Sequence, residues 1–111
     1  MATIAINQDV VTLVNVFSVD PDRQQPVIDV LVEATRAVMI GLPGFVSANI
    51  HRSLDGVKVV NYTQWRTTRD FEAMLRNAAA QKHMRSAEQL AISIEPHLYT
   101  VVFTDQVQTA P

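Results

Sequence analysis

Two carboxamides and one indole in this sequence can hold and polarise an oxygen-bearing aromatic ligand. Asn61 and Trp65 lie four residues apart in DGVKVVNYTQW, a run whose valines and tyrosine predict a β-strand. Side chains alternate along a strand, so both point to one face, about 13 Å apart. Asn15 shares the apolar face of another predicted strand with Leu13 and Phe17. Two amides and an indole N–H in one enclosed space can stabilise charge that develops on a ligand oxygen.

The same three residues are also consistent with a purely structural role. Buried amides usually satisfy backbone groups, and Trp65 can be an ordinary core residue. Spacing alone does not distinguish the two interpretations.

Other polar residues give no recognisable catalytic pattern. His51, His83 and His97 come from a predicted strand, helix and loop without paired metal-ligand spacing, so we expect no metal site. Arg85 lies near Glu88 in a predicted helix, and spacing alone favours a solvated arginine or an ion pair. There is no Ser-His-Asp order, glycine-rich phosphate loop or close carboxylate pair, so hydrolase and nucleotide-binding functions have no support.

The composition favours one soluble domain spanning residues 1–111. Hydrophobic residues make up 48% and charged residues 18%, which is ordinary for a globular protein. The net charge of -2 and the lack of a basic stripe exclude nucleic acid as an expected partner. There is no cysteine, no apolar run of the ~20 residues that span a membrane, and no signal-peptide pattern. We therefore expect a cytoplasmic protein with no membrane partner.

Hydrophobic periodicity predicts the element order β-α-β-β-α-β, which is the ferredoxin-like α+β arrangement. The predicted strands cover residues 9–19, 45–53, 57–65 and 98–104, and the predicted helices cover 21–40 and 67–90, with a break after Asn77. Asp20 or Asp22 is expected to cap the first helix, and Thr67 with Asp70 the second. The antiparallel four-stranded sheet would place its first and third strands side by side, so Asn15 and Asn61 would face the same space.

The strands are apolar on both faces, although the helices of this arrangement cover only one face. An uncovered apolar sheet face requires a partner. We therefore expect a homodimer in which two sheets pack face to face.

The register of the predicted hairpin decides where His51 points. A two-residue Asp-Gly loop pairs Ile50 with Asn61 and turns His51 to the opposite face. A three-residue loop pairs Asn49 with Asn61 and brings His51 to the face of Asn61. We favour the three-residue loop because it buries Phe45 under the helices, although a shift of one residue reverses the conclusion.

Four segments of the sequence, LVNVFSV, LPGFVSANIHRSLDG, VVNYTQWRTTRDFEAML and LYTVVFT, resemble the antibiotic biosynthesis monooxygenase family. The resemblance extends over about residues 9–105 and implies a dimeric α+β barrel. It also implies the oxidation of an anthrone- or hydroquinone-type, polyketide-like aromatic substrate to a quinone by O2. Members of the family do this without flavin, haem or metal, so the resemblance implies no cofactor.

The resemblance also assigns roles to individual residues. Asn15, Asn61 and Trp65 match the catalytic positions of the family. Its substrate-binding positions are occupied here by His51, Arg85 and Phe71. His51 would be the candidate base, whereas Phe71 replaces a tyrosine found in some members and cannot transfer a proton.

Three other functions fit parts of this pattern. A quinol monooxygenase of redox defence would use the same pocket and differ only in its substrate. A haem-degrading monooxygenase needs a helical tryptophan and, ten residues later, a histidine, where this sequence has Met74 and Met84. His83 is one residue away, which turns its side chain by about 100°. A non-catalytic dimer that binds a small aromatic molecule is the third, and the combination of Asn15, Asn61 and Trp65 argues against it.

Overall fold

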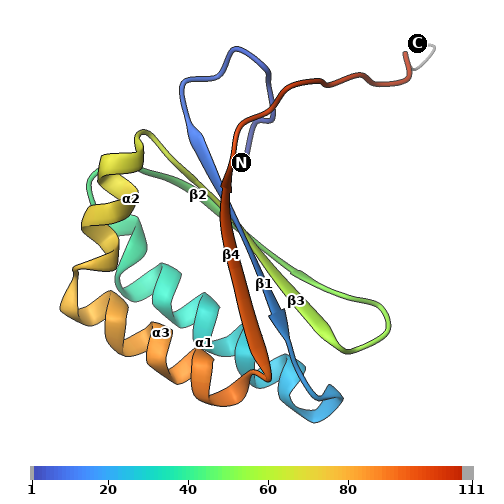
Figure 1. Cartoon of the computed structure of the whole chain (residues 1–111), viewed down its shortest axis with the longest axis vertical. Helices are drawn as coiled ribbons and strands as arrows, with labels where there is room; N and C mark the ends of the chain where they lie inside the picture. Colours follow the sequence, from blue (N-terminus) through green and yellow to red (C-terminus); the bar gives the residue numbers. More distant parts are fainter. Residues whose placement is uncertain (1, 109–111) are drawn as a thin grey trace.

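The computed structural model describes residues 2–108, and these fold into one antiparallel sheet covered on one face by helices (Figure 1). The strands are β1 (Val11–Ser18), β2 (Phe45–Arg52), β3 (Lys58–Trp65) and β4 (Ser93–Tyr99). The helices are α1 (Gln24–Ala37), α2 (Thr68–Leu75) and α3 (Ala78–Leu90), with 3-10 turns η1 (Pro21–Arg23) and η2 (Met39–Gly41). The strand order β2-β3-β1-β4 confirms the predicted ferredoxin-like fold with β1 and β3 at the centre. The sheet is open rather than closed into a barrel.

The core consists of two hydrophobic clusters at the two ends of the space between sheet and helices. One cluster contains Phe17 of β1 and Val59 of β3, packed against Val27 and Leu31 of α1. The other surrounds Trp65 at the far end of β3 and includes Met74 and Ala80. Along the inner face of β3, residues 61 and 63 lie between these two clusters. None of the helices in the described residues 2–108 is long and apolar enough to cross a membrane.

The predicted cap at Thr67 is confirmed, and the structure adds a cap at Asn77. Thr67 caps α2, because its hydroxyl oxygen accepts the Asp70 backbone N–H at 3.0 Å, and Asn77 caps α3 in the same way. The predicted carboxylate cap of the first helix is wrong. The chain enters α1 through the η1 turn, and the N-cap residue Arg23 makes no capping hydrogen bond through its side chain.

The last strand begins and ends about five residues earlier than predicted. Strand β4 covers Ser93–Tyr99 and includes Pro96, which a sheet edge tolerates because no neighbour needs its missing N–H. Its only neighbour is β1, which begins at Val11, so the chain beyond Tyr99 has no strand to pair with. Of the predicted strand 98–104, only the first two residues lie in the sheet, and the chain beyond Tyr99 leaves it as an extended tail (Figure 1).

The hairpin register differs from the favoured prediction. Ile50 pairs with Asn61 and His51 pairs with Val60, so His51 lies on the face away from the helices. The turn sets this register, since the Ser53 backbone N–H donates to the Lys58 carbonyl at 3.0 Å. At the other end of β2, a β-bulge between Phe45 and Ser47 shifts the register by one residue, so that Phe45 pairs with Trp65. The bulge lets the start of β2 bury its phenylalanine beside the helices while the rest of the strand keeps the register of the shorter loop.

Gly44 allows the chain to turn sharply between η2 and β2. Its φ of +81° lies in the left-handed region, and its carbonyl accepts the Arg66 backbone N–H at 2.8 Å. A β-carbon at this position would overlap the side chain of Asp70.

We expect Gly44→Ala to lower the free energy of unfolding by about 1–3 kcal/mol, because it adds both backbone strain and overlap. Urea denaturation followed by circular dichroism measures this change. Gly41→Ala is the matched control, since a β-carbon there has no neighbouring atom within 4 Å. Equal stability of the two variants would contradict the account of Gly44.

Candidate active site

A cavity of about 500 Å³ lies between the sheet and the helices. This is within the range of small-molecule pockets, roughly 300–1,000 Å³. Most of the side chains that line it are apolar, among them Leu13, Phe17, Leu31, Phe71, Met74 and Met84. A planar aromatic molecule is the kind of ligand that such walls accommodate.

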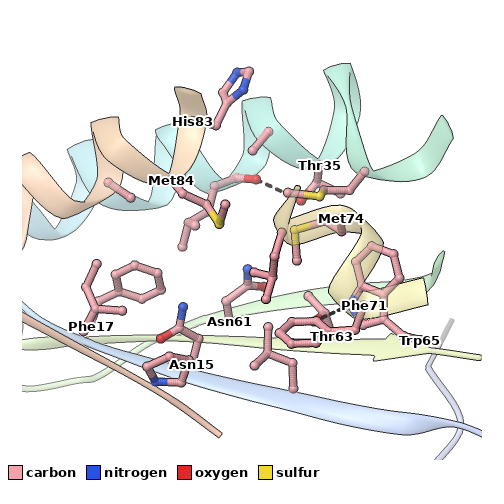
Figure 2. Close-up of a pocket in the computed structure, with 18 of the residues that line it drawn as sticks. Asn15, Phe17, Thr35, Asn61, Thr63, Trp65, Phe71, Met74, His83 and Met84 are labelled. Atoms are coloured by element: carbon pink, nitrogen blue, oxygen red, sulfur yellow. Dashed lines mark hydrogen bonds between the residues drawn. The ribbon is translucent and has the colours of Figure 1, made fainter. Parts of the chain in front are cut away.

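Two amides lie side by side on the floor of the cavity, which the sheet forms. Asn15 and Asn61 lie directly opposite each other on the central strands, and both line the cavity. Figure 2 shows both amide nitrogens pointing away from the sheet into the space below the helices. The two amide groups therefore offer N–H donors to the same part of the cavity.

The carbonyl oxygens of these amides have no hydrogen-bond partner. The Oδ1 atoms of Asn15 and Asn61 are both buried, and no group in the described residues pairs with either. An unsatisfied buried acceptor costs about 1–3 kcal/mol, and such atoms call for a specific explanation in a native structure. The alternative that the amide oxygens serve the backbone does not match this arrangement.

Trp65 closes one end of the cavity as a fixed apolar wall. Its ring is 1% exposed and makes edge-to-face contacts with Phe45 and Phe71, at centroid distances of 5.4 and 6.4 Å. Its Nε1–H donates to the Thr63 hydroxyl at 3.3 Å. The indole N–H that the sequence suggested as a ligand donor is therefore already used within the protein.

The structure brings some of the predicted site residues together and separates others. Phe71 lines the cavity from α2, next to Trp65. His51 is exposed on the opposite face of the sheet, so its candidate role as a base has no geometric support. Arg85 is exposed on α3 and is not among the residues that line the cavity.

Sequence reasoning did not select several polar residues that line this cavity. Thr35 and Thr63 contribute hydroxyl groups, and His83 lies at the boundary of the cavity on α3. Strand alternation already placed Thr63 on the face of Asn61, so a signal for it existed. The His83 ring lies 3.0 Å from the Ala79 carbonyl through Nδ1 and points away from the two amides (Figure 2).

Comparison with known proteins identifies the class of this molecule. Residues 10–89, more than half of the chain, match the antibiotic biosynthesis monooxygenase family. The chain belongs to this family, and it is an oxidoreductase of the monooxygenase type.

Individual relatives support the same class. Tetracenomycin-F1 monooxygenase of Streptomyces glaucescens is 49% identical over 83 residues, which cover 75% of this chain and 74% of that protein. SnoaB, a cofactor-independent oxygenase from Streptomyces nogalater, is 27% identical with a TM-score of 0.71, over 87% of this chain and 97% of SnoaB. The ActVA-Orf6 monooxygenase of Streptomyces coelicolor, solved with nanaomycin D, has a TM-score of 0.80 over 88% of this chain and 92% of its own. At 22% identity, it shows the shared fold alone.

We expect a planar anthraquinone to quench the fluorescence of Trp65, the single tryptophan of the sequence, because its ring lines the cavity. Titration with 1,8-dihydroxyanthraquinone should give saturable quenching with one site per chain. N-acetyltryptophanamide is the control and should show only a linear, collisional response. A linear response of the protein as well would mean that the cavity does not take this ligand.

Proposed function

We propose that this protein is a cofactor-independent monooxygenase that oxidises an anthrone- or hydroquinone-type polycyclic aromatic compound to a quinone with O2. The observation that carries the proposal is the pair Asn15 and Asn61, whose amide nitrogens point into a mostly apolar cavity. The activities named for tetracenomycin-F1 monooxygenase and for SnoaB support the same reaction class.

The substrate itself can supply the electrons for this reaction. Loss of a proton from the reactive ring carbon of an anthrone gives a delocalised anion, with much of its charge on the ring oxygen. This electron-rich anion transfers an electron to O2, and carbon–oxygen bond formation follows. One oxygen atom becomes the new carbonyl, and the other leaves as water with the two hydrogens of that carbon. Atoms and electrons balance without a further reductant.

The protein contributes an environment rather than a reacting group. The N–H donors of Asn15 and Asn61 would stabilise the anion at its oxygen, where the charge develops. Apolar walls exclude water and hold the ring flat in one orientation, with Trp65 at one end. The aromatic substrate and O2 would both occupy the space above the two amides.

We expect Asn61→Ala to lower kcat by about 100-fold, and Asn15→Ala to have a similar effect, because each removes one donor to the anion. Oxygen uptake and quinone absorbance with dithranol, a 1,8-dihydroxyanthrone, measure the rate. The matched control is Asn49→Ala, which removes an amide from β2 whose Nδ2 donates to Ser47 and to the Tyr62 carbonyl.

Each outcome of this experiment has a defined meaning. Full turnover in both variants would remove the amides from the mechanism. Saturable binding without oxygen uptake by the unaltered protein would favour a non-catalytic binding protein.

We also propose that two copies of the chain associate through the face of the sheet away from the helices. Its centre carries the half-buried apolar side chains of Val14, Val16, Val60 and Tyr62. Val102 and Phe103, in the tail beyond β4, are also exposed apolar side chains. A second copy would cover this apolar surface and remove it from water.

We expect size-exclusion chromatography with light scattering to give twice the mass of the chain. Val16→Asp should shift the protein towards single chains, because it buries an unpaired charge at the centre of the proposed interface. Ile40→Asp is the control, since Ile40 is 62% exposed and lies in the η2 turn rather than in a strand of the sheet. Identical masses for both variants would contradict an interface on this face.

A further inference from the structure

We infer that Thr63 is a further substrate-binding residue, whose hydroxyl donates to a second oxygen on the edge of the aromatic substrate. The inference deepens the proposed function and rests on it. It narrows the substrate class to compounds with two neighbouring oxygens on one ring edge, such as a 1-hydroxy-9-anthrone.

The position of Thr63 in the fold places it beside the amides. It lies on the inner face of β3 between Asn61 and Trp65, opposite Leu13 of β1. Same-face neighbours on a strand are about 7 Å apart along it, which is within reach of two oxygens of one ligand. Thr63 is 6% exposed and lines the cavity.

The hydrogen bonds of Thr63 leave its hydroxyl proton free. A threonine hydroxyl has one O–H donor and two acceptor lone pairs. The Trp65 Nε1–H donates to this oxygen at 3.3 Å, so one lone pair is used (Figure 2). No acceptor for the hydroxyl proton is found among the described residues, and the cavity is the open direction beside it.

Thr35 also lines the cavity, but its hydroxyl proton is already used within the protein. The Thr35 hydroxyl donates to the Leu31 backbone carbonyl at 2.8 Å within α1. Its proton is therefore occupied, although Thr35 also lines the cavity. Of these two threonines, Thr63 is the one with a donor left for a ligand.

Trp65 strengthens the donor that Thr63 presents. Its N–H polarises the hydroxyl oxygen, which makes the remaining O–H a better donor, as in other hydrogen-bond chains. The ring is held between Phe45 and Phe71, so the N–H keeps its direction. Trp65 therefore orients a donor for the substrate although its own N–H does not reach into the cavity.

The test compares two substrates that differ only in the hydroxyl groups beside the ketone. Thr63 would donate to the oxygen of one of these groups. Dithranol carries hydroxyl groups beside the ketone, and anthrone carries none. Thr63→Val should lower kcat/KM for dithranol about tenfold and change that for anthrone less than twofold, because one hydrogen bond is lost with dithranol only. Thr63→Ser should restore most of the dithranol rate. Thr12→Val is the control, as Thr12 is buried on the opposite face of β1.

The outcomes separate this inference from a structural role of Thr63. An equal loss for both substrates would mean that Thr63 only positions Trp65, and would overturn the inference. A changed Trp65 emission spectrum with unchanged kinetics would overturn it too. If Thr63→Val does not fold, Thr63→Ala takes its place in the same comparison.

A binding measurement tests the Thr63 contact even if the protein does not catalyse the proposed reaction. If the unaltered protein oxidises neither substrate, that function is wrong, and Trp65 quenching then compares the binding of 1,8-dihydroxyanthraquinone and anthraquinone. If Thr63→Val binds 1,8-dihydroxyanthraquinone more weakly than the unaltered protein does but binds anthraquinone equally well, the contact is still supported. Equal binding by the variant and the unaltered protein would overturn it.

Discussion

The antiparallel pairing of β1 with β3 is the constraint on which the site depends. It sets Asn15 directly opposite Asn61 and turns both towards the helices. A slip of one residue in either strand would move its amide to the opposite face of the sheet. The same alignment pairs Phe17 with Val59 and Val11 with Trp65, so both strands contribute side chains to each hydrophobic cluster.

The site combines features that oppose stability. The two amide oxygens are buried without partners, and a cavity of about 500 Å³ separates the helices from the sheet. Both features are unfavourable for a folded chain, because unsatisfied groups and unfilled space each lose interactions. A protein departs from local consistency mainly where function requires it. The cavity is therefore better explained by a ligand than by packing.

The polar side chains that the two central strands present to the cavity, Asn15, Asn61 and Thr63, are neutral. Amides and hydroxyls provide donors at fixed positions, and these need not reorganise as charge develops on the substrate. The apolar walls lower the local dielectric and strengthen each of these interactions. Such an arrangement suits a reaction in which the substrate provides its own electrons and the protein controls orientation and access of water.

The sequence by itself determined the element order, the helix cap at Thr67, and the shared face of Asn61 and Trp65, because these follow from local periodicity and side-chain chemistry. Tertiary structure decided the rest. The turn between β2 and β3 set the register that points His51 outward, and the bulge next to Phe45 buried that ring all the same. Strand β1 begins at Val11, so β4 has no pairing partner beyond Tyr99. The hydrogen bond from Trp65 to Thr63 also emerged only there. Register, strand ends and donor pairing depend on which segments become neighbours, and that information is not local to any stretch of the chain.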